Sequence, residues 1–312
     1  MTINKKDVKF KARHFNLAGR LFFPENFDES KKNPAIIISH PTSADMNQTS
    51  SIYAEELAKK GFLALVFDAS YQGQSEGEPR FLEDPYARTE DVSFAVDYLV
   101  SLPYVDQNKV GAMGICAGGG YTINAAKVDH RIKAVAGVVA GSSGGAYRES
   151  FGPDEKLIEV LEQMGEQRTA EAQGAEPLLV NYYPTSNEAV KEMGITDVDI
   201  VQAVDYYTTP RGQDKYSPNK VRYTSMAYML GYDPLHMIDK LLTQPLLMIA
   251  GGIPGQFGSY RLAYDVYYKS ATKADEKELY IVPETTHYEL YDQPEAVSKA
   301  VNKLSEFFGK YL

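Results

Sequence analysis

The segment KVGAMGICAGGGY, residues 109–121, decides the fold. It opens with an apolar run that predicts a strand and continues into GGYTINAAKV, which is compatible with a helix. Between them, residues 114–118 form a G-x-C-x-G pentapeptide, the strand–turn–helix pattern of a nucleophile elbow with cysteine in place of serine. Small neighbours are needed because this turn is strained and closely packed. We therefore predict that Cys116 is a nucleophile; the alternative is a buried core cysteine.

Composition limits the class of protein. The 312 residues are 44% hydrophobic and 24% charged, which is typical of a soluble globular chain with one large domain. The net charge of −10 argues against nucleic acid or an anionic membrane as partner. Cys116 is the only cysteine, and we see no signal-peptide pattern and no apolar run of membrane-spanning length. We expect a cytoplasmic protein and leave a homodimer open.

Short apolar runs alternate with amphipathic segments, which predicts an α/β fold with a mostly parallel, doubly wound sheet and helices on both faces. We expect an opening hairpin over 8–14 and 19–23, strands at 35–39, 62–67, 109–115, 132–140, 245–250 and 278–282, and helices at 50–60, 89–102 and 294–311. The alternation stops between residues 142 and 243. The sequence thus divides into a core of residues 1–141 and 244–312 and an inserted helical cap, 142–243.

The cap shows no strand-like apolar run but carries helix start signals. These are Pro153-Asp154, and the capping patterns that begin at Thr185 and Thr196. Such an insertion is expected to cover the site, and the alternative is a peripheral or dimerisation element.

A thiol attacks only as thiolate, so Cys116 needs a base or a positive field, and the following helix N-terminus supplies part of that field. Among five histidines, His287 lies in a polar loop after the last strand and before the last helix. Loops at the carboxyl ends of parallel strands line the site in this architecture, and the chain order also fits. We predict that His287 is the base.

The oxyanion hole is expected to use the amide of Ala117, directly after the nucleophile. A second amide should come from the loop after strand 35–39, where Pro41 has no N–H, so Thr42 or Ser43 is predicted as donor. His40 in the same loop is a candidate polar group of the pocket. Asp68, at another strand end, is expected to fix a glycine-containing turn.

The third catalytic member is not settled by the sequence. The loop 251–259 should carry the acid that orients His287, and it contains no carboxylate. Neutral side chains orient the histidine in some cysteine enzymes, which makes Gln256 and Ser259 candidates. Carboxylates from neighbouring loops are the other candidates: Glu149, Asp154 and Glu284.

The elbow and His287 resemble the α/β-hydrolase superfamily over essentially the whole chain. The stretches FDASYQGQS (67–75), LEDPYAR (82–88) and THYELYD (286–292) look like a dienelactone-hydrolase-related group of bacterial hydrolases and fungal polyketide-transferase-like proteins. The resemblance implies ester, thioester or lactone chemistry through an acyl-cysteine, on a small acyl substrate. We expect no metal and no other cofactor.

The chain also departs from these families. Relatives usually place an aspartate in the turn 253–259 and a glycine-rich loop after His40-Pro41, where this chain has TSAD. Dienelactone hydrolases proper are shorter, lack so large a cap and carry a glutamate near the position of His40, so dienelactone is not the expected substrate. Two alternatives to hydrolysis stay open: a small-molecule binding protein with little turnover, and an acyltransferase or cyclase that uses the same cysteine.

Overall fold

The computed structural model describes residues 3–312 and contains an eight-stranded sheet in the order β1-β2-β4-β3-β5-β6-β9-β10. The strands are β1 (Asn4–Lys11), β2 (Asn16–Phe23), β3 (Asn33–Ser39), β4 (Leu63–Phe67), β5 (Val105–Ile115), β6 (Ile132–Val138), β9 (Leu246–Gly251) and β10 (Lys277–Val282). Strand β2 pairs antiparallel with β1 and β4, and all other pairs are parallel. The predicted mostly parallel sheet is confirmed.

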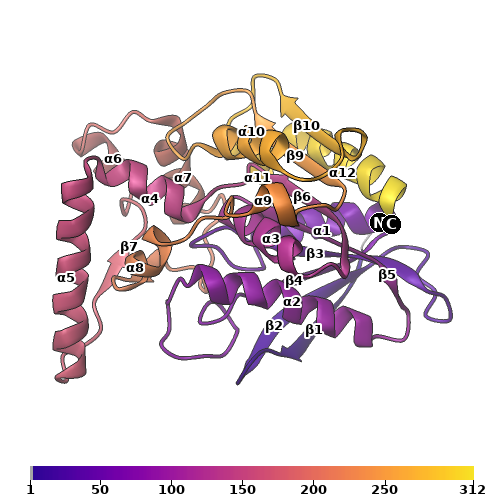
Figure 1. The fold of residues 1–312 in the computed structure, drawn as a ribbon, viewed down its shortest axis with the longest axis horizontal. Coiled ribbons are helices and arrows are strands. Elements are labelled where there is room, and N and C mark those ends of the chain that lie inside the picture. Colours follow the sequence, from indigo (N-terminus) through magenta and orange to yellow (C-terminus); the bar gives the residue numbers. More distant parts are fainter. Residues whose placement is uncertain (1–2) are drawn as a thin grey trace.

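Helices cover both faces of the sheet (Figure 1). Along β3, Ile36 and Ile38 belong to one buried core and Ile37 to the other, because successive side chains of a strand point to opposite faces. The first core includes α1 (Thr49–Lys59), α11 (Glu289–Asp292) and α12 (Pro294–Tyr311); the second includes α2 (Pro85–Ser101), α3 (Ala117–Val128) and α10 (Ser259–Lys269). The sheet is therefore doubly wound.

The segment between β6 and β9 extends to one side of the sheet (Figure 1). It contains α4 (Ser143–Phe151), α5 (Asp154–Ala172), α6 (Asn187–Glu192), α7 (Val198–Thr208), α8 (Ser225–Leu230) and, next to the core, α9 (Ile238–Leu241). It also contains two antiparallel strands that were not predicted, β7 (Leu179–Asn181) and β8 (Lys220–Arg222). Three residues are too few for an alternating pattern to be recognised.

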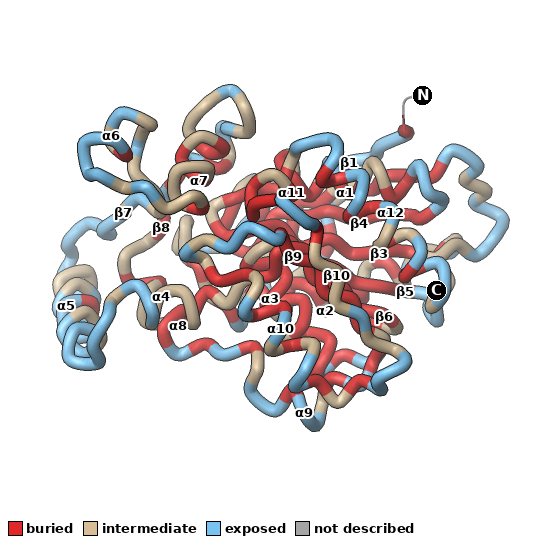
Figure 2. The backbone as a smooth tube through the Cα atoms, turned by 90° about the horizontal axis from the view of Figure 1, so that it is seen from above, coloured by how far each residue is buried: buried red, intermediate tan, exposed pale blue. Residues whose placement is uncertain are grey.

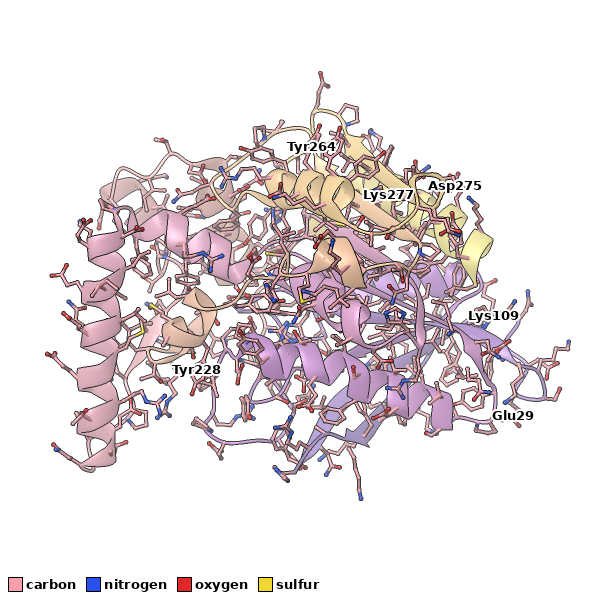
Figure 3. All side chains as sticks on the ribbon, viewed as in Figure 1. Glu29, Lys109, Tyr228, Tyr264, Asp275 and Lys277 are labelled. Carbon is pink, nitrogen blue, oxygen red and sulfur yellow. The ribbon has the colours of Figure 1, made fainter. Side chains whose placement is uncertain are left out.

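The helices of this segment differ in burial. Helix α5 is largely exposed (Figure 2), and Met164 is its one buried residue. It contacts α8, which carries Tyr228 (Figure 3), and Arg168 of α5 donates a hydrogen bond of 3.3 Å to the hydroxyl of Tyr228. Helix α7, in contrast, buries Tyr206 and Tyr207 in the core that contains α1 and α12. Helix α7 is thus the element that anchors the cap beside the site.

Two predicted helix starts are shifted by one residue. The N-cap of α6 is Ser186 and that of α7 is Asp197, rather than Thr185 and Thr196. In each case two adjacent residues can cap, and the observed one places its side-chain oxygen against the free amides of the first turn. Helix α5 begins at Asp154, as predicted.

Within residues 3–312, no helix combines the length and apolar character that crossing a membrane requires.

Candidate active site

Cys116 occupies the turn between β5 and α3 with φ 53° and ψ −128°, in the left-handed half of backbone space. Its amide donates to the carbonyl of Val138, and its carbonyl accepts from Gly119 and Gly141. A Cβ on Gly118 would collide with the carbonyl of Ser39 on the neighbouring strand. The small residues of the pentapeptide are therefore required by close backbone packing, as the elbow pattern predicts.

Cys116 is partly exposed and lines a cavity. Burial nevertheless raises the pKa of Cys116 to about 11, against hydrogen bonds from the Tyr291 side chain and the Ala117 amide that lower it. The resting sulfur is therefore a thiol. The part of the field that the helix N-terminus supplies is therefore not enough to lower the pKa of Cys116, because desolvation outweighs the favourable contacts.

His287 follows β10 and is 2% exposed. Burial lowers the pKa of His287 to about 3, so the ring is neutral at pH 7. Its Nδ1 lies 3.2 Å from Oγ of Ser259, the first residue of α10, and its Nε2 lies 3.3 Å from the hydroxyl of Tyr291. Both ring nitrogens are thus occupied by hydroxyl groups.

Among the candidates for orienting His287, Ser259 alone contacts the ring within residues 3–312. Gln256 lines the cavity, and its backbone N–H donates to the carboxylate of Asp197. Glu149 lies on the surface of α4 in an ion pair with Arg261, so it is turned away from the histidine. Asp154 and Glu284 are both exposed.

The expected oxyanion loop meets the elbow. Thr42 and Ala117 line the same cavity as Cys116. Ser43 adopts φ 61°, its carbonyl accepts from Ser217 of the cap, and it is not among the residues lining this cavity. Thr42 and Ala117 therefore lie on the wall of the cavity with Cys116, and Ser43 does not.

His40 does not face the cavity, contrary to expectation. It is fully buried, its Nδ1 lies 2.7 Å from the carbonyl of Pro41, and its Nε2 accepts from the Ala69 amide at 3.1 Å. Burial and the charge of Arg88 hold the pKa of His40 well below its usual value. His40 is consequently a neutral group that fixes the start of the oxyanion loop.

An ion pair lies beneath this loop. Glu83 and Arg88 are 3.1 Å apart with both side chains almost fully buried, and Tyr121 donates to Glu83 at 2.7 Å. Arg88 also donates to the carbonyl of His40. The pair belongs to the stretch 82–88, which the sequence analysis singled out by resemblance without assigning a role. Its contacts hold the loop that follows β3.

Asp68 has the structural role that was predicted. Its two carboxylate oxygens accept from the amides of Met46 and Gln74, each at 2.7 Å. A Cβ on Gly73 would collide with this carboxylate. The side chain thus ties the turn 68–75 to the loop that leads into α1.

Four tyrosines that the sequence analysis did not assign to the site belong to, or pack against, the same buried cluster that Cys116 contacts. Tyr183 and Tyr207 come from the cap and stack at 5.4 Å, while Tyr288 and Tyr291 come from the His287 segment, with ring centroids 4.5 Å apart. One sequence signal could have placed Tyr291 near His287. The two residues are four positions apart, the spacing of neighbours on one helical face.

The cavity at Cys116 has a volume of about 320 Å³ and lies between core and cap. Its apolar lining includes Tyr147, Tyr183, Met193, Ile195, Ile200 and Phe257. No charged side chain is among the described residues that line it. Such a cavity suits a neutral, mainly apolar ligand.

The cap contributes a carboxylate to the loop that lacks one. Asp199 of α7 is 1% exposed and accepts from the Phe257 amide at 2.9 Å, while its second oxygen has no hydrogen-bond partner within residues 3–312. Burial raises the pKa of Asp199 to about 6. Asp199 attaches α7 to the loop 252–258 and does not reach His287.

Nowhere in residues 3–312 do three potential ligands gather closely enough to hold a metal ion.

Comparison with known proteins identifies the family. Residues 14–179, just over half of the chain, match the family model for X-Pro dipeptidyl-peptidase (S15 family). The chain belongs to the S15 family. The chain is also similar to YcjY of Escherichia coli, an uncharacterized protein that is 39% identical over 300 residues, 95% of either chain. The crystal structure of PA2218 from Pseudomonas aeruginosa superimposes with a TM-score of 0.89 at 32% identity, over 99% of this S15 chain and 94% of that one.

Two further comparisons bear on fold and class. Thiohydrolase aneE of Aspergillus aculeatus is 30% identical over 246 residues, 77% of this chain and 73% of its own. The α/β-hydrolase GrgF from Penicillium has a TM-score of 0.78 at 21% identity, over 99% of both chains. The predicted α/β-hydrolase fold is thus confirmed, and the match to a peptidase family agrees with a hydrolase-type protein on this scaffold.

Proposed function

We propose that this protein hydrolyses thioesters or esters of neutral, mainly apolar acids through an acyl intermediate on Cys116. The observation that carries the proposal is the position of Cys116. It lies at a left-handed elbow on the wall of a cavity whose described lining holds no charged side chain. A core cysteine needs neither the strained turn nor access to a cavity.

The residues around the sulfur supply what acyl transfer requires. Sulfur attacks the acyl carbonyl carbon, and the amides of Ala117 and Thr42 donate to the oxygen as it becomes negative. His287, neutral and with Nδ1 against Ser259, takes up the thiol proton and returns it to the leaving group. Water then attacks the acyl-cysteine by the same path in reverse, releasing the acid and restoring the thiol.

The cavity supports the choice of substrate. A charged acyl group would be desolvated against Tyr147, Ile195 and Phe257 without a cation to pair with, which is costly. The name of the relative aneE, a thiohydrolase, supports thioesters ahead of oxygen esters. The cytoplasmic location and the homodimer stay predictions.

The proposal is tested by steady-state hydrolysis of acyl thioesters and matched oxygen esters of increasing chain length. A succinyl thioester and a pentanoyl thioester form the control pair, because they have similar length and differ in the terminal charge. We expect kcat/KM to be at least about tenfold lower for the succinyl thioester, and turnover to be lost in Cys116→Ala and His287→Ala.

Undiminished turnover in Cys116→Ala would contradict the proposal. Product that forms only with an added alcohol or amine acceptor would instead indicate an acyltransferase. Saturable binding of the thioester without any product would indicate a binding protein.

A further inference from the structure

Three aromatic rings pack against the imidazole of His287. Its ring centroid lies 5.7 Å from that of Phe257, 5.0 Å from that of Tyr288 and 5.3 Å from that of Tyr291. Phe257 belongs to the loop after β9, and the two tyrosines belong to residues 285–292 after β10, which we call the base segment. The orientation of the proposed base therefore depends on where this loop and this segment lie.

Cap residues at the start of α7 hold the loop after β9. The carboxylate of Asp199 accepts from the backbone N–H of Phe257 at 2.9 Å, and that of Asp197 accepts from the backbone N–H of Gln256 at 3.1 Å. A Cβ on Gly255 would collide with the carboxylate of Asp199, so this loop packs directly on the helix. The loop is thus attached to the cap at two neighbouring backbone groups.

Cap residues also hold the base segment. Arg211, which follows α7, donates from Nε and Nη2 to the two carboxylate oxygens of Asp292, each at 2.8 Å. The same Nη2 donates to the carbonyl of Tyr288 at 3.0 Å. A bidentate pair of this kind fixes the relative orientation of its partners as well as their distance. In α7, Oε1 of Gln202 lies 2.8 Å from Oγ1 of Thr286. The residue before the base and the residue after it are therefore both bound to the cap.

We propose that Arg211 is a positioning residue for His287, which holds the base segment against the cap and thereby sets the orientation of the imidazole. The proposal rests on the function proposed above, in which His287 is the base. It adds that the cap fixes the base in addition to lining the cavity.

The core holds the base segment at other points. From α1, Thr49 donates to the carbonyl of Tyr291 at 2.9 Å, and Tyr53 donates to the carbonyl of Leu290 at 2.7 Å. These contacts do not involve Arg211, so the base segment should stay folded when that side chain is removed. The expected result is a loss of orientation rather than of fold, and a misplaced base slows proton transfer more than it weakens substrate binding.

The first test compares two arginines of the cap. Arg222 pairs with Glu171 within the cap, and their side chains are 16% and 12% exposed, against 20% and 13% for Arg211 and Asp292. We expect kcat for a pentanoyl thioester to fall about tenfold in Arg211→Met, with KM within about twofold of wild type. Both constants should stay within about twofold of wild type in Arg222→Met. Equal losses of kcat in the two variants, or no loss in Arg211→Met, would overturn the proposal.

Asp292→Asn covers the case in which Arg211→Met does not fold. The asparagine keeps the shape of the side chain and weakens the pair, while the hydrogen bond from Arg211 to the carbonyl of Tyr288 remains. We expect kcat to fall about fivefold, again with KM nearly unchanged. A kcat within about twofold of wild type contradicts the proposal.

Protonation of His287 gives a readout that needs no acyl substrate. Burial lowers the pKa of His287 from 6.5 to about 3, and the titratable side chains that pack against its ring, Tyr288 and Tyr291, stay neutral because burial raises their pKa. Nitrogen-15 NMR of histidine-labelled protein follows the ring, and His287→Ala assigns its signals. Between pH 8 and pH 5, the ring should stay neutral in wild type and Arg222→Met. In Arg211→Met it should titrate with a midpoint above pH 5, because a loosened segment admits water to the ring.

The two readouts separate this inference from the proposed function. A ring that stays neutral down to pH 5 in Arg211→Met would overturn the inference, even if the wild type hydrolyses thioesters. If the wild type hydrolyses none, the proposed function fails. A ring that then titrates in Arg211→Met and not in Arg222→Met would still support the positioning role.

Discussion

Oγ of Ser259 lies 3.2 Å from Nδ1 of His287. The two residues meet because Ser259 begins the helix after β9 and His287 follows β10, and these parallel strands are neighbours. A hydroxyl therefore stands in the loop where the resemblance to α/β-hydrolases led us to expect an aspartate. Since a neutral group does not stabilise an imidazolium by charge, its contribution is to hold the tautomer and the ring orientation.

Replacing Ser259 by alanine should lower kcat about fivefold and leave KM nearly unchanged, because one hydrogen bond of about 1 kcal/mol is lost at the base. The measurement is thioester hydrolysis with purified variants. Glu149→Ala is the control, because Glu149 pairs with Arg261 on the surface and should not affect the rate. The assignment is wrong if Glu149→Ala lowers kcat as much as Ser259→Ala does.

Gly118→Ala should destabilise the fold by about 1–3 kcal/mol, since the added Cβ would collide with backbone atoms of Ser39 and His40. Gly165→Ala in α5 is the control: nothing lies near its added Cβ, and alanine should stabilise that helix by about 0.5–1 kcal/mol. Urea unfolding of both variants checks the difference. Equal effects would show that the elbow is not closely packed.

Asp199→Asn should change the pH dependence of stability. Burial raises the pKa of Asp199 from 3.8 to about 6, so the folded protein holds this proton more tightly than the unfolded chain does. The resulting stabilisation is full below pH 3.8 and is lost as the pH rises through 6. Between pH 5 and pH 8, wild type should lose about 1 kcal/mol relative to Asp199→Asn. A constant difference over this range would contradict the raised pKa.

Arg88→Leu should cost about 3–5 kcal/mol, because it leaves the carboxylate of Glu83 buried without its cation. The double variant Arg88→Leu/Glu83→Leu should recover part of this loss, since no unpaired charge then remains. The free energy of unfolding in urea measures both. If Glu83→Leu lowers the free energy of unfolding of Arg88→Leu by another 3–5 kcal/mol instead of raising it, the unpaired charge is not the cause of the instability of Arg88→Leu.

The parts of the site that follow from local sequence were predicted well. The turn at Cys116 requires small neighbours, and the strand–turn–helix pattern around it is contiguous in the chain. The strands β3, β4, β9 and β10 appear as short apolar runs, which places His287 after the last of them. Ser259 was one of two neutral candidates in the loop after β9, and only geometry separates it from Gln256.

The remaining features depend on contacts between distant segments. Asp199 meets Phe257, and Tyr207 packs against Tyr288, across the boundary between cap and core. No periodicity links such pairs, so the sequence does not reveal them. The raised pKa of Cys116 could not be predicted for the same reason, because the helix N-terminus is visible in the sequence and the degree of burial is not.

The central claim is that Cys116 carries the acyl group, and intact-protein mass spectrometry during turnover of a pentanoyl thioester tests it most directly. The account predicts a transient adduct of one acyl mass on the wild type that maps to Cys116. The adduct should be absent in Cys116→Ala and slow to form in His287→Ala. Continued product formation by Cys116→Ala, or an adduct that maps to another residue, would contradict the account.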